Sequence, residues 1–131
     1  MKDGIPICIS LRLPKANNPN KREHWAGKMK KVSVERSLAE MEARSVISGT
    51  AISGQIRGNK APKWKKARIH CTWTAKHEKF LPDEGNAHSR LKAFIDGFQD
   101  AGIFVDDKYV TTTIDRVVGP KAGVEFVISE A

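Results

Sequence analysis

The chain has 131 residues, of which 40% are hydrophobic and 29% are charged, and its formal net charge at pH 7 is +8. This length suits one domain with a substantial core and is short for two, so we expect a single domain over residues 1–131. The sequence has no apolar run near the roughly 20 residues of a membrane span and no signal-peptide pattern at its N-terminus, which predicts a cytoplasmic protein.

The charge is distributed unevenly along the chain. Residues 1–80 carry 18 Lys and Arg against 6 Asp and Glu, a balance of +12, whereas residues 81–131 carry 5 against 9, a balance of −4. A basic part beside an acidic part indicates one surface that binds a polyanion and another that binds a cation. The alternative is a solvated, generally basic surface without a specific partner.

The first half of the chain predicts one strand and one helix. Apolar residues alternate over residues 5–13, as in a half-buried strand that ends at Pro14, and a turn-rich basic loop follows over 15–22. Residues 25–46 have a helical pattern, with Val34, Leu38 and Met41 spaced to share a buried face. Cys8 and Cys71 both fall in strand-like runs, so we expect buried free thiols rather than a disulfide or a metal cluster.

The second half predicts a mobile connector, a strand, a helix and two further strands. Glycine and basic residues dominate the connector over 48–66, and alternation over 67–75 predicts the second strand. A helix over 89–102 would bury Leu91, Phe94, Ile95 and Phe98 and stop at Gly102. Strands over 109–118 and 124–128 would form a hairpin with a five-residue loop. This order predicts an α/β (α+β) fold, a small mixed four-stranded sheet with two main helices.

Acidic residues flank the second helix. Asp83 and Glu84 precede it, and Asp106 and Asp107 follow the turn after it. A helix of this length spans about 20 Å, so the two pairs can share a metal ion only if the segment before the helix folds back along it, in which case their oxygens would suit Mg²⁺. The alternatives are ordinary: Asp-Asp is common in turns, and acids before a helix favour its positive end.

Lys92 and Asp96 also admit two interpretations. With Gln99 they form a polar stripe opposite the apolar one, where they could make a simple surface ion pair. The wider stretch, however, resembles the core of the RusA family of Holliday-junction resolvases, in the longer-loop form found in phage and prophage genomes. The matching segments are Asp83-Glu84-Gly85-Asn86, Lys92, Asp96-Gly97, Asp100-Ala101-Gly102 and Asp106-Asp107, and 13–18 is similar to the family's loop after the first strand.

The resemblance implies a homodimer, in a bacterial or phage-infected cell, that cuts branched DNA at four-way junctions with Mg²⁺, for which Mn²⁺ could substitute. It implies that Asp83, Lys92 and Asp107 are catalytic, and that Asp83, Asp106 and Asp107 bind the metal. Such hydrolysis needs metal ions to activate water and to stabilise the leaving oxygen. Lys92 would stabilise charge on the phosphate.

One position departs from the family pattern. The second aspartate of the motif falls on Gly85, which has no side chain, and Glu84 is the nearest substitute metal ligand. An Mg²⁺ site weakens when it loses a carboxylate. The sequence therefore leaves open a degenerate homologue that binds branched DNA without cutting it, or a basic nucleic-acid-binding module whose acidic turn only satisfies helix ends.

DNA binding has separate support from the basic residues. Lysines flank Trp64, which could stack on an unpaired base or could equally be a core residue. The four histidines show no ligand spacing. Together with the family resemblance, the sequence predicts DNA contacts from Asn17, Asn18, Lys21, Arg22, Lys63, Lys65, Lys66 and Asn86.

Overall fold

The structure is a computed structural model that describes residues 6–15, 25–48 and 61–131. In chain order the elements are β1 (Ile7–Leu11), α1 (Trp25–Ile47), β2 (Ala67–Ala75), the 3-10 turn η1 (Glu78–Phe80), α2 (Glu84–Asp100), the 3-10 turn η2 (Asp107–Tyr109), β3 (Val110–Val118) and β4 (Gly123–Glu130). This is the predicted α+β class. Within the described part, no helix is both long and apolar enough to cross a bilayer.

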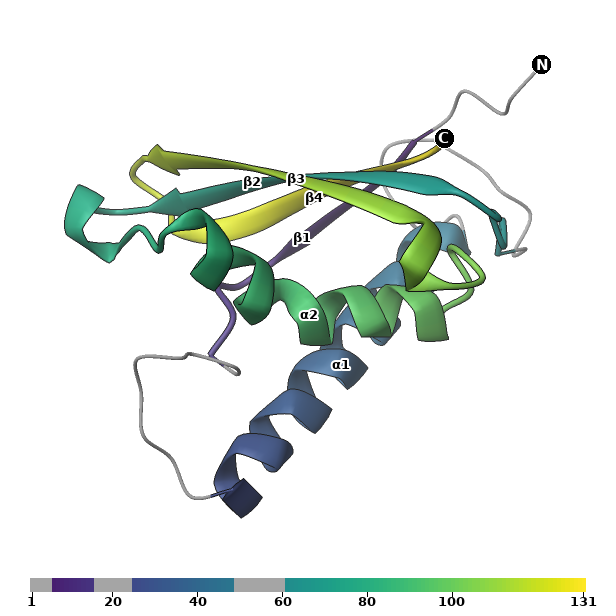
Figure 1. Ribbon diagram of the computed structural model, residues 1–131, viewed down its shortest axis with the longest axis horizontal. Coiled ribbons are helices and arrows are strands. Elements are labelled where there is room, and N and C mark those ends of the chain that lie inside the picture. Colours follow the sequence, from purple (N-terminus) through teal and green to yellow (C-terminus); the bar gives the residue numbers. More distant parts are fainter. Residues whose placement is uncertain (1–5, 16–24, 49–60) are drawn as a thin grey trace.

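The four strands form one mixed sheet in the order β1-β4-β2-β3 (Figure 1). β4 pairs antiparallel with both β1 and β2, whereas β3 pairs in parallel with β2. The predicted hairpin between the last two strands is therefore wrong. In this central place Val124, Phe126 and Ile128 are buried on the face that the helices cover, where Phe126 contacts α2. These are long-range contacts, which the short loop before β4 does not reveal.

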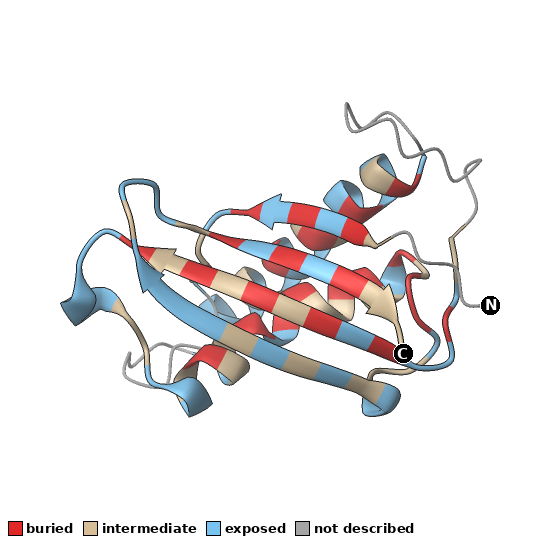
Figure 2. Ribbon diagram, turned by 90° about the horizontal axis from the view of Figure 1, so that it is seen from above, coloured by how far each residue is buried: buried red, intermediate tan, exposed pale blue. Residues whose placement is uncertain are grey.

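Both helices cover the same face of the sheet and leave the other face open (Figures 1 and 2). Inward-facing residues of every strand except the edge strand β3 are buried, and they alternate with exposed ones in β1 and β4. On the helix side, Phe94 and Phe98 of α2 make edge-to-face contacts with Phe126, with ring centroids 6.2 and 4.9 Å apart. The apolar stripe predicted for this helix is thus confirmed, with Ile95 at its partly buried margin.

α1 packs through a different face from the one predicted. Its buried residues are Glu35, Ala39, Ala43 and Ile47, whereas Val34 and Met41 are 52% and 70% exposed. The reason is a close helix crossing, because a Cβ added to Gly97 of α2 would lie only 2.7 Å from the Cβ of Ala39. Small residues allow this approach, so they occupy the interface although larger apolar residues lie elsewhere on α1.

α2 begins earlier than predicted and ends as predicted. Asp83 is its N-cap, with a side chain that accepts a hydrogen bond from the backbone of Asn86, so the helix starts at Glu84 rather than near 89. At the other end Gly102 has a φ of +86°, a conformation that favours glycine. The earlier start places Asp83 at the N-cap and Glu84, Gly85 and Asn86 in the first turn of α2.

The two cysteines differ in exposure, so the prediction of two buried thiols holds for only one of them. Cys71 is buried and burial raises the pKa of its thiol to about 12, whereas Cys8 lies on the open face of the sheet and is exposed. Because alternate residues of β1 face opposite sides, Cys8 points away from the core that its neighbours Ile7 and Ile9 enter.

Thiol labelling will distinguish the two positions. We expect a thiol-specific reagent at neutral pH to modify Cys8 in the folded protein and to spare Cys71, which becomes reactive only in denaturant. Peptide mapping after labelling measures both sites. Rapid modification of Cys71 in the native protein would contradict the buried position.

Candidate functional site

A lysine held between two carboxylates lies where η2 approaches α2. Lys92 Nζ donates hydrogen bonds to Asp96 Oδ1 at 2.7 Å and to Asp107 Oδ2 at 2.5 Å. Asp96 is one helical turn further along α2, and Asp107 is brought back to the helix by the turn at Gly102. The structure thus joins two motif segments that are 15 residues apart in the sequence.

This arrangement favours the charged forms of Lys92 and Asp107. The hydrogen bonds that Lys92 donates to Asp107 and, second, to Asp96 raise the pKa of Lys92 above its ordinary value of 10.5. The hydrogen bond from Lys92 lowers the pKa of Asp107 below its ordinary value of 3.8. Lys92 is 54% exposed, so its ammonium group is available to a ligand on the surface. At neutral pH the site presents a cation flanked by two anions.

The stability that this pair contributes should be constant around neutral pH. Because the pKa of Asp107 is lowered on folding, its contribution is present above pH 3.8 and is lost as the pH falls through the lower folded-state value. Because the pKa of Lys92 is raised, its contribution is present below pH 10.5 and is lost only at more alkaline pH. We expect NMR titration to give Asp107 a midpoint below 3.8, and a midpoint above 3.8 would contradict the ion pair.

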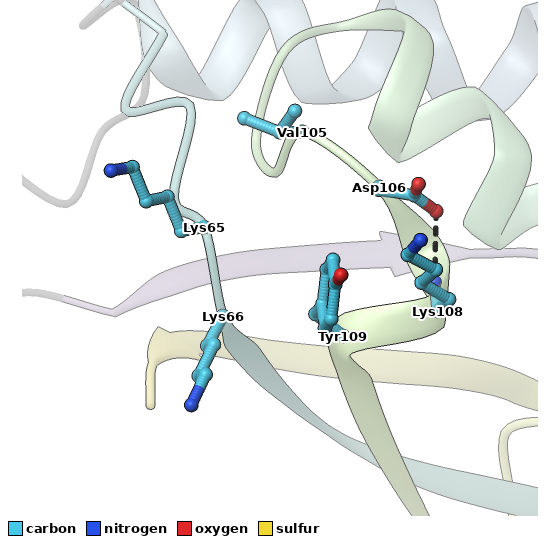
Figure 3. A pocket seen from close by; sticks show the side chains of 6 residues that line it. All are labelled: Lys65, Lys66, Val105, Asp106, Lys108 and Tyr109. Atoms are coloured by element: carbon cyan, nitrogen blue, oxygen red, sulfur yellow. Dashed lines mark hydrogen bonds between the residues drawn. The ribbon is translucent and has the colours of Figure 1, made fainter.

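A depression opens beside this centre because two connecting segments differ in length. Trp64 and Phe104 pair as an isolated parallel bridge, and the β2–β3 ladder begins at Ala67 and Val110. In the segment that leads into β2, two residues, 65–66, separate the bridge from the ladder. In the segment that leads into β3, five residues, 105–109, do so. The longer segment contains η2, and a cavity of about 470 Å³ lies between the two segments (Figure 3). Its lining residues are Lys65, Lys66, Val105, Asp106, Lys108 and Tyr109.

Asp106 and Asp107 therefore face different surroundings although they are adjacent. Asp107 contacts Lys92 on α2, whereas Asp106 caps η2 by accepting a hydrogen bond from the Lys108 backbone and lines the depression. The Asp-Asp turn thus connects two neighbouring features. One is the Lys92 centre, made of Lys92, Asp96 and Asp107, and the other is the lysine-lined depression, to which Lys65, Lys66 and Lys108 contribute. Plain turn chemistry explains the role of Asp106 in the cap, but it does not explain the contact of Asp107 with Lys92.

The acids at the start of α2 form a separate group. Asp83 Oδ1 accepts the backbone N–H of Asn86 at 2.7 Å, and its Oδ2 accepts the Asn86 side-chain amide at 3.2 Å. Glu84 is exposed and its Oε1 lies 3.9 Å from His88 Nε2. Asn86, predicted to contact DNA, is thus bound to Asp83. These contacts are those of a helix cap.

The four predicted metal ligands, Asp83, Glu84, Asp106 and Asp107, do not converge. Across residues 6–15, 25–48 and 61–131, no three Asp, Glu, His or Cys side chains are close enough to hold one metal ion. Asp83 precedes Lys92 by nine residues, about 13 Å along a helix axis. Because α2 starts directly after Asp83, no extended segment carries this acid back along the helix to Asp107. The predicted fold-back, which needed an extended segment between Asp83 and the helix, is therefore wrong.

The basic residues predicted to bind DNA are only partly within the described chain. Asn17, Asn18, Lys21 and Arg22 lie outside it, as do residues 49–60 of the predicted connector. Residues 61–66 are fixed against the chain after α2, because Lys63 N and Trp64 N donate to Gly102 O and Ile103 O. Trp64 is 5% exposed, which confirms the core alternative for this residue, and Lys63, Lys65 and Lys66 are exposed beside it.

No protein-family model matches the chain, and no curated protein matches its sequence. The resemblance to the RusA resolvases therefore rests on the motif residues quoted from the sequence. Of these, the structure gathers Lys92, Asp96 and Asp107 into one centre and leaves Asp83 with Asn86 at the start of α2.

A buried carboxylate that the sequence reasoning did not identify holds the segment after β1. Glu35 is 1% exposed, and its Oε2 accepts hydrogen bonds from Arg12 Nη1 at 2.8 Å and from Lys15 N at 2.7 Å. Arg90 of α2 donates to Pro14 O at 2.8 Å. These contacts fix the start of the basic loop against both helices. The one available signal was the spacing of Glu35, Ala39 and Ala43, which places a single acid on a small-residue face.

Proposed function

We propose that the protein is a structure-specific endodeoxyribonuclease that binds four-way junctions and other branched DNA and cuts them with Mg²⁺ as cofactor. The observation that carries the proposal is the Lys92 centre, in which Lys92 Nζ contacts Asp107 and Asp96 beside a depression lined by three lysines. The motif resemblance supplies the reaction, and the function would be performed in the cytoplasm of a bacterial or phage-infected cell.

Lys92 is suited to act on a phosphodiester. Its ammonium is charged at neutral pH, and Asp96 and Asp107 accept two of its three N–H donors, so the third can be donated to a phosphate oxygen. Charge that develops on a phosphate during hydrolysis is stabilised by a cation positioned beforehand. Asp96 and Asp107 hold the lysine in that position, so it needs little reorganisation when the substrate binds.

The carboxylates do not fit Mg²⁺ as they are arranged. Mg²⁺ prefers oxygen ligands and is usually held by one or two carboxylates together with water and substrate phosphates. Asp107 offers one carboxylate, but its Oδ2 is bonded to Lys92, and Asp83 is bonded to Asn86. On the proposed function, DNA phosphates would have to supply the remaining ligands of the ion. We therefore assign no reaction step to the ion.

The same arrangement favours a second candidate function, binding of branched DNA without cleavage. The lack of a cluster of three acids in the described residues and the glycine at 85 both point to this degenerate form. The lysine-lined depression and the net charge of +8 would serve binding equally well in either case.

A homodimer is part of the proposal. α1 exposes Trp25, Met29, Val34 and Met41, with exposed fractions of 73%, 46%, 52% and 70%. Val34 and Met41 are seven residues apart and share the face of α1 opposite its buried residues, whereas Trp25 and Met29 lie on the other side of the helix. We propose that a second copy of the chain covers the face with Val34 and Met41, since exposed apolar patches mark interaction surfaces. A two-fold dimer would present two Lys92 centres to two strands of like polarity. Light scattering should therefore give twice the mass of one chain, and the mass of a single chain would contradict the dimer.

A substrate panel tests the proposal and separates it from the alternative. We expect tighter binding to a synthetic four-way junction than to a linear duplex or a single strand of the same sequence in EDTA, and cleavage of the junction on addition of Mg²⁺ or Mn²⁺. Selective binding without cleavage in either metal would establish the second candidate. Equal binding to all three substrates without cleavage would leave a basic nucleic-acid-binding module.

A further inference from the structure

We propose that the lysine-lined depression is a subsite for one unpaired nucleotide, with the base against Tyr109 and Val105 and the phosphate against Lys65 and Lys66. The inference extends the proposed function, on which its biological meaning rests, by assigning a ligand to a surface to which the motif contributes only Asp106.

The size and lining of the depression suit such a ligand. Its volume of about 470 Å³ lies within the range of about 300–1,000 Å³ that is usual for small-molecule sites. Tyr109 and Val105 are 53% and 58% exposed, so apolar surface in the depression is accessible to a ligand. A nucleotide offers an apolar base face and an anion at once, which this combination of side chains matches.

The charges are arranged asymmetrically around the tyrosine. Lys65 and Lys66 lie on the segment that enters β2, and Asp106 and Lys108 lie on the opposite segment, with Tyr109 between them (Figure 3). Lys108 Nζ is 4.9 Å from the centroid of the Tyr109 ring. Figure 3 shows Lys65 and Lys66 extending in different directions, away from Tyr109, so their side chains must turn to reach one anion. Because Asp106 repels an anion, we place the phosphate on the side of these two lysines.

The position of the depression links it to the proposed reaction. Asp106 lines it, whereas the next residue, Asp107, contacts Lys92. A nucleic-acid strand that placed a phosphate at Lys92 would therefore have an adjacent nucleotide within reach of Tyr109. Bases near the crossover of a junction are unstacked more easily than those inside a duplex, so the subsite would favour branched over linear DNA.

Fluorescence of a stacked base gives a direct test. The probe is a short single-stranded oligothymidylate that carries one 2-aminopurine, bound to the full chain in EDTA so that no metal chemistry occurs. We expect binding to quench the 2-aminopurine. Tyr109→Ala should abolish the quenching and weaken binding about five- to a hundred-fold, whereas Tyr109→Phe should retain both.

The salt dependence separates stacking from charge. Lys66→Ala should lower the slope of log affinity against log salt by about 0.7, the value for one lost phosphate contact on a single strand, whereas Tyr109→Ala should leave the slope unchanged. Lys121→Ala is the matched control, because Lys121 is exposed in the turn between β3 and β4, at the far end of β3 from the depression. It should leave the quenching unchanged.

The outcomes distinguish this inference from the proposed nuclease. Oligonucleotide binding without quenching, quenching that survives in Tyr109→Ala, or no binding at all would overturn the subsite, whatever the protein does to junctions. Quenching that depends on Tyr109 in a protein that cuts no junction would support the subsite and count against the nuclease.

Discussion

Replacing Asp107 by asparagine should reduce junction cleavage at least about a hundredfold, a loss typical of removing one electrostatic group from a reaction centre. Asparagine keeps the size of the side chain but removes the charge that holds Lys92 Nζ at 2.5 Å. Single-turnover cleavage of a labelled junction in Mg²⁺ measures the effect.

The fold should survive this change, because partly exposed ion pairs contribute at most about 1 kcal/mol. Junction binding in EDTA should be retained or strengthened, since one negative charge near the DNA is lost. Asp115→Asn is the matched control: Asp115 is 68% exposed on β3 and pairs with His70 rather than with a lysine. Cleavage at the wild-type rate by the Asp107 variant would show that this turn is not the reaction centre.

Replacing Gly97 by leucine should lower the free energy of unfolding by about 3 kcal/mol, the upper end of the usual cost of overpacking. A Cβ at this position would lie 2.7 Å from the Cβ of Ala39 and 3.0 Å from the backbone nitrogen of Glu40, so α1 must move away from α2. The displacement would also strain the ion pair between Arg36 and Asp100, which joins the helices at 2.5 Å. Chemical denaturation measures the loss.

The same substitution at Gly27 gives the control. A Cβ on Gly27 meets nothing within 4 Å, and leucine is a much better helix former than glycine. Gly27→Leu should therefore be neutral or should stabilise the protein by up to about 1 kcal/mol. If Gly97→Leu were as stable as Gly27→Leu, the helices would not cross as closely as the structure has them.

The sequence predicted the elements of the fold better than their arrangement. Alternation located β2 at residues 67–75 because its side chains are buried on one face, and Gly102 was correctly predicted to stop α2. The placement of β4 between β1 and β2 depends on contacts between distant segments, which no local pattern encodes. For α1, periodicity favoured the large residues Val34 and Met41, whereas the close crossing at Gly97 required small ones.

The candidate site was predicted only in part, because local patterns reveal contacts within one helix but not contacts between distant segments. The spacing of Lys92 and Asp96 on one helix is local, and their ion pair follows from it. The contact with Asp107 depends on how the chain returns after Gly102 and was not predicted; the family resemblance only assigned both residues to one catalytic site. The separation of Asp83 from Asp107 follows from the start of α2, which was placed several residues too late because Gly85 and Asn86 disfavour a helix interior.

Mapping the cuts on a four-way junction tests the central claim most directly. Each of the four strands is labelled in turn, incubated with the protein and Mg²⁺, and resolved at single-nucleotide resolution. We expect incisions at symmetric positions in two strands of like polarity, made by two Lys92 centres in one dimer. Intact strands from a protein that binds the junction, or cuts scattered over all four strands, would contradict the account.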